Sequence, residues 1–95
     1  MREEMIFTQE ELKRIRKSRS NTIYADIHGM NCKQARRFLR NLIAVHREAF
    51  TLTVIHGYHH GTSLRDMIAA ETLSQREQSK RIKKGNPGQT EVVIA

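Results

Sequence analysis

Residues 22–28 alternate between apolar and polar side chains, which is the two-residue period of a β-strand. A second run rich in β-branched residues covers 51–56, and each of these runs ends in the pair His-Gly. Between them, apolar residues recur at helical spacing, which predicts an amphipathic helix that begins after Asn31 as N-cap and ends near Phe50. A strand, a helix and a second strand in this order predict a parallel pair joined by a right-handed crossover.

The N-terminal segment predicts a helix of its own. Thr8 and Glu11 have the spacing of a capping box, and the helix is expected to continue to about Lys17. The chain is therefore divided into an N-terminal helix and hinge over residues 1–21 and an α/β domain over residues 22–95. The N-terminal helix is expected either to support self-association or partner binding, or to cover an open face of the sheet.

The C-terminal third predicts one more helix and two strands. Ser63 is the expected N-cap of the helix, and the Asn-Pro-Gly segment 86–88 predicts a type II turn. Residues 91–94 predict a last strand, which pairs with a short strand around Ile82. The predicted fold class is α/β, a two-layer sandwich with a βαβαββ core and a mixed four-stranded sheet, plus the N-terminal helix.

The two His-Gly pairs are expected to meet at one rim of the sheet, because parallel strands end at the same edge and α/β domains place ligands there. Asp26 and His28 share a face of the first strand, so the carboxylate can fix the tautomer of the imidazole. His56 would approach from the neighbouring strand. Two helices also begin at this rim, and Gly57 and Gly61 let the backbone approach an anion closely.

These side chains suggest phosphodiester chemistry. One histidine would act as general base and another as acid, while Arg65 would stabilise the charge that develops on the phosphate. A purely structural role stays open for each: Asp26 and His28 would then shape the strand end, and His56 would be a partly buried residue hydrogen-bonded to backbone.

The charge balance adds a class of partner. The chain has 95 residues with 17 Lys and Arg against 10 Asp and Glu, a net charge of +7, which favours a polyanion such as nucleic acid or an anionic membrane surface. No apolar stretch is long enough for a signal peptide or a transmembrane span. The N-terminal helix has only Leu12 and Ile15 on its apolar stripe, which is too thin to bind a membrane surface, so no membrane partner is expected. The single cysteine, Cys32, excludes an internal disulfide framework and fits a cytoplasmic protein.

The expected nucleic-acid contacts lie in the two loops, in the first turn of the third helix and on basic elements. They are Gly29, Gly57, Tyr58, His59, His60, Gly61, Ser63, Arg65, Arg36, Arg40 and Lys83. An aromatic ring at a loop tip, as at Tyr58, can stack on a base. The histidines of the second loop also suggest zinc or nickel, with Asp26 as the carboxylate ligand, but adjacent histidines do not converge easily. No cofactor is firmly predicted, and a divalent metal stays an alternative.

Two segments resemble motifs of the Smr (small MutS-related) domain family. Residues 25–29, Ala-Asp-Ile-His-Gly, are similar to its first motif, Leu-Asp-Leu-His-Gly, with Ala25 in place of a leucine. His56-Gly57 through Leu64-Arg65 resembles its second motif, His-Gly-x-Gly before a helix with a Leu-Arg pair. His59 stands where the family has its second glycine. The resemblance runs from residue 22 to the C-terminus.

The resemblance implies a sandwich similar to the C-terminal domain of translation initiation factor three. It also implies nucleic-acid binding and, in a number of members, endonuclease activity on DNA or RNA, in some cases on messenger RNA at stalled ribosomes. Asp26 and His28 match the residues of the first motif, and His56 and Gly57 match the second loop. Three functions follow as alternatives: an endonuclease, a non-catalytic module that binds nucleic acid or the ribosome, and a small metal- or anion-binding protein. Self-association is a further expectation.

Overall fold

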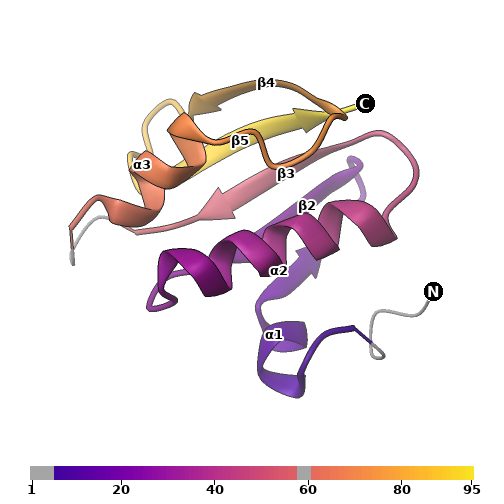
Figure 1. Cartoon of the computed structure of the whole chain (residues 1–95). Helices are drawn as coiled ribbons and strands as arrows, with labels where there is room; N and C mark the ends of the chain where they lie inside the picture. Colours follow the sequence, from indigo (N-terminus) through magenta and orange to yellow (C-terminus); the bar gives the residue numbers. More distant parts are fainter. Residues whose placement is uncertain (1–5, 58–60) are drawn as a thin grey trace.

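A computed structural model describes residues 6–57 and 61–95 of the chain as a mixed α/β fold (Figure 1). Its elements, in chain order, are α1 (Gln9–Lys13), β1 (Ile15–Lys17), β2 (Thr22–Asp26), α2 (Cys32–Val45), β3 (Phe50–Ile55), α3 (Ser63–Ala70), β4 (Glu77–Ile82) and β5 (Gln89–Ile94). The strands form one five-stranded sheet in the order β1-β2-β3-β5-β4. No helix in the described part of the chain is long and apolar enough to span a membrane.

The predicted parallel pair forms the centre of this sheet. β2 and β3 run parallel, with Ile23 opposite Leu52 and Ala25 opposite Val54, and α2 makes the crossover between them. These four side chains are buried on the face that the helices cover. Figure 1 shows α2 and α3 on that same face. The strand, helix and strand predicted from the alternation are therefore confirmed.

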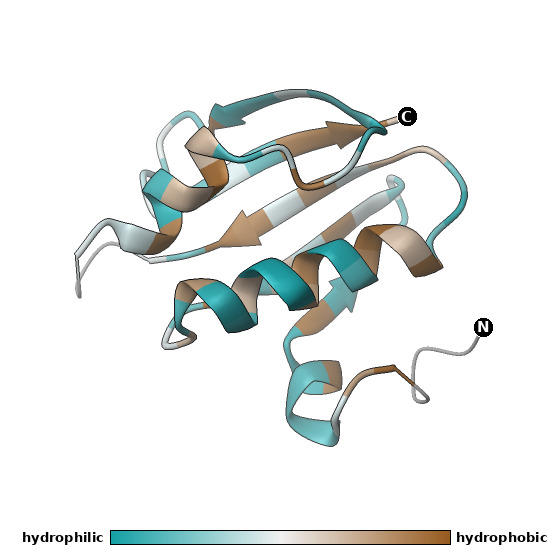
Figure 2. Cartoon of the chain, in the orientation of Figure 1, coloured by the Kyte–Doolittle hydropathy of each residue, from teal (hydrophilic) through white to brown (hydrophobic). Residues whose placement is uncertain are grey.

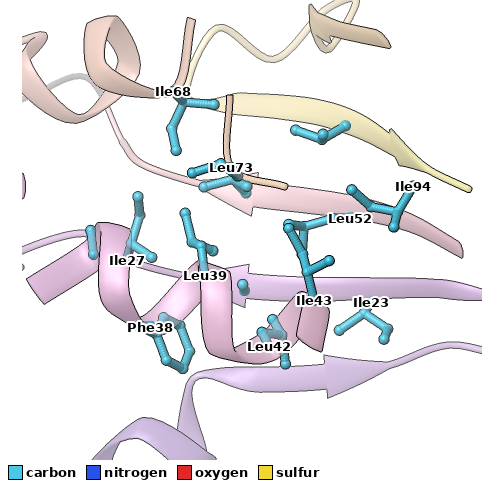
Figure 3. Packing of buried hydrophobic residues seen from close by; sticks show 14 of the residues in the cluster. Ile23, Ile27, Phe38, Leu39, Leu42, Ile43, Leu52, Ile68, Leu73 and Ile94 are labelled. Atoms are coloured by element: carbon cyan, nitrogen blue, oxygen red, sulfur yellow. The ribbon is translucent and has the colours of Figure 1, made fainter. Parts of the chain in front are cut away.

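Local capping and one apolar stripe determine α2. The side chain of Asn31 accepts a hydrogen bond from the backbone N–H of Gln34 at 2.7 Å, as the sequence predicted. The buried side chains of α2 are Ala35, Phe38, Leu39, Leu42 and Ile43. Figure 3 shows Phe38, Leu39, Leu42 and Ile43 between the helix and the sheet, and the outer surface of α2 is hydrophilic (Figure 2).

The predicted end of this helix, near Phe50, is wrong. α2 ends at Val45, and the next residue, His46, has extended backbone angles. Phe50 is instead the first residue of β3, where it lies opposite Ile94. Phe50 belongs to the inward-facing residues of β3, and its position also fits the helical spacing of apolar residues in α2. The spacing of apolar residues therefore did not show where the helix ends and the strand begins.

The predicted N-terminal helix is too long. The capping box of Thr8 and Glu11 is present, but α1 ends at Lys13. Residues 15–17 form β1, which pairs antiparallel with β2 and covers its edge. The sheet therefore has five strands instead of the four predicted.

The N-terminal helix packs beside the helix layer. The ring of Phe7, just before α1, is 5% exposed and meets the ring of Phe38 edge to face, with centroids 5.5 Å apart. Figure 1 shows α1 at the lower edge of the molecule, next to β1 and α2. The expectation that this helix covers the open sheet face is thus wrong, because the segment that leads into it packs against α2 through Phe7.

The C-terminal hairpin agrees with the sequence except for its turn type. β4, which contains Ile82, pairs antiparallel with β5 as predicted. The N–H of Gln89 donates to the carbonyl of Asn86 at 3.1 Å, which closes the turn. Gly88 lacks the positive φ that a type II turn requires, so that prediction is wrong. Its buried carbonyl instead accepts hydrogen bonds from the end of β3.

The burial of Phe7 gives a test of the proposed division at residue 21. We expect Phe7→Ala to lower the free energy of unfolding by about 3 kcal/mol, because a buried aromatic ring is lost from the core. Urea denaturation of both proteins measures the change. Ile82→Ala serves as the control, since Ile82 is 46% exposed and its loss should cost less than about 1 kcal/mol. A loss below about 1 kcal/mol for Phe7→Ala would place the N-terminal segment outside the cooperative unit.

Candidate functional site

The two His-Gly segments lie side by side at the carboxyl end of β2 and β3. Asp26 is opposite Ile55 in the parallel register, and the N–H of Ile27 donates to the carbonyl of Ile55 at 2.9 Å. A Cβ placed on Gly57 would lie 3.8 Å from the Cβ of His28, in ordinary contact. Gly57 has a φ of +73°, which favours glycine at this turn. The prediction of one shared rim is confirmed.

Asp26 and His28 form a hydrogen-bonded pair at this rim. One carboxylate oxygen of Asp26, Oδ1, accepts the backbone N–H of His28 at 3.1 Å and is also hydrogen-bonded to its ring Nδ1. A proton on Nδ1 that points to the carboxylate leaves Nε2 as the nitrogen open to a ligand. The His28 side chain is 64% exposed and that of Asp26 33%, so both can be reached from solvent.

Arg14, which caps the end of α1, holds the backbone around this pair. Its Nη1 donates to the carbonyls of Asp26 at 3.1 Å and His28 at 2.9 Å, and the N–H of Asp26 donates to the carbonyl of Arg14 at 2.9 Å. Arg14 is not among the predicted site residues, because the predicted N-terminal helix extends past it to about Lys17. Recognition of β1 would have placed Arg14 beside the end of β2.

His56 has a different environment from His28. Its side chain is buried at 6% exposure; its Nδ1 donates to the carbonyl of Gly57 at 3.0 Å, and its Nε2 accepts from the hydroxyl of Thr90 at 2.8 Å. The backbone N–H groups of His56 and Gly57 both donate to the carbonyl of Gly88 at 3.0 Å. The ring nitrogens of His56 are thus engaged within the protein. No sequence pattern predicted that Thr90 and Gly88 would form hydrogen bonds with His56.

A pocket of about 660 Å³ opens beside the Asp26–His28 pair. It is bounded by the ends of β2 and β3 and by the first residues of α2 and α3. Its lining includes Met30, Ile55 and Leu64 as apolar side chains and His28 and His56 as polar ones. Of the predicted loop contacts, four line it: Gly29, Gly57, Gly61 and Ser63. Tyr58, His59 and His60, also predicted as contacts, lie outside the described residues.

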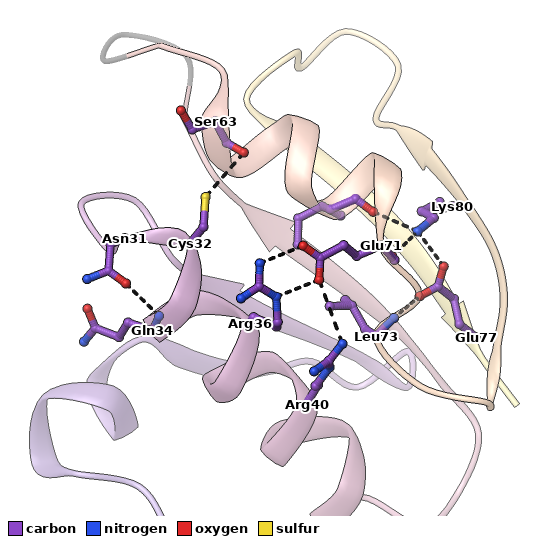
Figure 4. Close-up of polar contacts among 11 residues, drawn as sticks. Asn31, Cys32, Gln34, Arg36, Arg40, Ser63, Glu71, Leu73, Glu77 and Lys80 are labelled. Atoms are coloured by element: carbon purple, nitrogen blue, oxygen red, sulfur yellow. Dashed lines mark hydrogen bonds and ion pairs between the residues drawn. The ribbon is translucent and has the colours of Figure 1, made fainter.

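The beginning of α3 differs slightly from its prediction. Thr62 occupies the N-cap position with non-helical backbone angles, and Ser63, the predicted cap, is the first helical residue. The carbonyl of Ser63 accepts a hydrogen bond from the thiol of Cys32 at 3.6 Å, which joins the first turns of α2 and α3 (Figure 4). Arg65 lies on the first turn of α3, where its Nε is 3.6 Å from a carboxylate oxygen of Asp66, and it does not line the pocket.

Two of the predicted basic contacts face a carboxylate of the protein itself. The guanidinium of Arg36 binds both carboxylate oxygens of Glu71, at 2.6 and 2.7 Å, and Arg40 lies 3.9 Å from the same group (Figure 4). The hydrogen bonds from Arg36 lower the pKa of Glu71 below its usual range. Lys80 donates to the carbonyls of Ile68 and Glu71 and thereby caps the end of α3. These contacts join α2, α3 and β4.

The third basic contact, Lys83, lies on the other face of the sheet. Its Nζ is 5.7 Å from the centre of the Tyr24 ring, and the guanidinium carbon of Arg16 is 4.3 Å from the same centre.

Among residues 6–57 and 61–95, no group of three or more His, Cys, Asp or Glu side chains is arranged to hold a metal ion.

Comparison with protein-family models matches residues 25–93 of the 95-residue chain to the family described as the Smr domain. The matched range begins within β2 and ends within β5, and it contains both His-Gly segments, α2, β3, α3 and β4. A search of curated proteins found no match.

The pair of Arg36 and Glu71 predicts an acid-dependent part of stability. Because the folded pKa of Glu71 is lowered, its contribution is present above its ordinary pKa of 4.5 and is lost as the pH falls through the folded value. We expect Glu71→Gln to have a lower melting temperature than the wild type at pH 7, and this difference to shrink below about pH 4.5. Thermal unfolding followed by circular dichroism over this pH range measures it. Glu48→Gln, at an exposed position, is the control, and an equal pH profile for wild type and Glu71→Gln would contradict the prediction.

Proposed function

The chain belongs to the Smr domain family, whose members generally bind nucleic acid, and on that premise we propose that it is an RNA endonuclease acting at Asp26 and His28. The observation that carries the proposal is the hydrogen bond between the Asp26 carboxylate and His28 Nδ1. It leaves an exposed imidazole nitrogen beside a pocket, which is what a general base needs.

The reaction follows from the chemistry of RNA. His28 Nε2 takes the proton of the ribose 2′-hydroxyl, and the freed oxygen attacks the adjacent phosphorus. The bond from phosphorus to the 5′-oxygen breaks, and water supplies a proton to that leaving oxygen. The products are a 2′,3′-cyclic phosphate and a 5′-hydroxyl. Asp26 accepts a hydrogen bond from the Nδ1–H group throughout and stays ionised, so it orients the ring and stabilises the imidazolium that forms.

RNA is favoured over DNA because RNA carries its own nucleophile. One imidazole that acts as general base next to the phosphate can then start the reaction. Hydrolysis of DNA, in contrast, needs a water molecule that is positioned and activated. His56 has its ring nitrogens bound to Gly57 and Thr90, so we assign it to holding the rim in shape. Arg65, in the first turn of α3, is our candidate for neutralising charge on the phosphate.

The test is cleavage of a labelled single-stranded RNA by the purified full chain. We expect His28→Ala to slow cleavage about 100-fold or more, because a general base contributes on that order. The control is His46→Gln, which changes a histidine that follows the opposite end of α2. The control should cleave at the wild-type rate, and the melting temperature of each variant shows whether it is folded.

Substrate changes in the same assay separate the alternatives. A single 2′-deoxy substitution at the cleaved nucleotide should stop cleavage there, and the rate should be unchanged in EDTA. A requirement for a divalent metal, or equal cleavage of the matching DNA, would contradict this mechanism. Full cleavage by His28→Ala would exclude the site, and binding of RNA by a wild type that cleaves nothing would leave a non-catalytic binding module.

A further inference from the structure

The sheet face that α2 and α3 leave uncovered carries a half-buried tyrosine with two cations over its ring, which a stacking base would have to displace. This inference rests on the proposed function and adds the form of its substrate. We propose that a single-stranded segment of the RNA lies across this face and stacks a base on Tyr24, next to the phosphate held at His28. In the following, "open face" means the outward residues Arg16, Tyr24, Glu91, Arg81 and Lys83; Thr53 lies between Tyr24 and Glu91 but is only 1% exposed.

Strand register places Arg16, Tyr24, Thr53, Glu91 and Arg81 in one row, and Lys83 follows just beyond the end of β4. Neighbouring strands pair Arg16 with Tyr24, Tyr24 with Thr53, Thr53 with Glu91, and Glu91 with Arg81. Directly opposite residues on adjacent strands project from the same side of a sheet, so the row crosses all five strands. The inward residues next to this row, such as Ile23, Leu52 and Val92, are buried under the helices. The open face is thus the opposite side.

The chemistry of this row suits a single strand of nucleic acid. Arg16 lies 4.3 Å and Lys83 5.7 Å from the Tyr24 ring centre, and neither forms an ion pair with a carboxylate in the described part of the chain. Arg81 does so, with Glu91 at 3.5 Å. An aromatic ring accompanied by unneutralised cations binds both parts of a nucleotide, since the ring stacks on the base and the cations attract the phosphates.

The open face is continuous with the rim. Tyr24 and Asp26 are two residues apart on β2, so they share its outward side at a separation of roughly 7 Å. A strand whose reactive phosphate lies at His28 can therefore place a neighbouring nucleotide over Tyr24. Bases in a duplex are already stacked and cannot lie on the ring, so this arrangement selects unpaired RNA.

Binding of a short fluorescent oligouridine, followed by anisotropy, tests the proposal with the full chain. We expect Tyr24→Leu to weaken binding about 10-fold, because stacking on one base is lost, and Tyr24→Phe to bind like the wild type. Binding of a hairpin with the same number of nucleotides should change little in either variant. Equal melting temperatures establish that the variants are folded.

Salt dependence tests the cations separately. Replacing Arg16 and Lys83 together by glutamine should lower the slope of log K against log salt by about 1.4, which is the effect of two lost phosphate contacts on a single strand. The matched control replaces Lys33 and Arg37, exposed residues of α2, by glutamine. It removes the same charge from the helical side of the protein and should leave the slope nearly unchanged.

Three outcomes would overturn the proposal, and they can be told apart from failure of the proposed function. If Tyr24→Leu binds oligouridine like the wild type while cleavage still depends on His28, the open face is not involved but the endonuclease stands. If the wild type neither binds nor cleaves RNA, both proposals fail. If the wild type is a dimer in solution and Tyr24→Leu is a monomer, the open face joins two copies of the chain.

Discussion

The parallel register of β2 and β3 is the constraint on which the rest of this molecule depends. It places Asp26 opposite Ile55 and brings both His-Gly turns to one edge. A slip by one residue would turn every side chain of the strand to the other face, so Asp26 would enter the apolar interior and Ala25 would face solvent. The burial of Ala25, Leu52 and Val54 therefore fixes the rim as well as the core.

The same register explains why two histidines in similar sequence positions have different environments. His28 continues the outward-facing series of β2 and is exposed. His56 continues the inward series of β3, after Leu52 and Val54, so it is buried and bonded to Thr90. The resemblance of the two His-Gly pairs concealed this difference. The alternation of apolar and polar residues, continued to the histidine at the end of each strand, distinguishes the two. Only His28 falls on the same face as polar neighbours.

Local rules predicted the elements that local interactions determine. The caps at Thr8 and Asn31 were correct because a side chain bonds to a backbone N–H three residues later. β1 could not be predicted in this way, since three residues after a helical turn become a strand only by pairing with β2. Arg14 depends on that pairing, and the bond of Arg36 to Glu71 joins residues 35 positions apart. Sequence spacing carries no information on such contacts.

The arginines show why net charge is a poor guide to a binding surface. Arg76 donates to the carbonyls of Ala95, Ile43 and Glu48, and Arg14 and Arg36 are likewise bound within the protein. Their positive charges count toward the total of +7, yet their donors hold the chain together. A long-range attraction to a polyanion depends on all charges, whereas specific contacts depend on donors that the fold leaves unused. By that criterion the surface that we propose for nucleic acid is smaller than the net charge suggests, and it is limited to the rim and the uncovered side of the sheet.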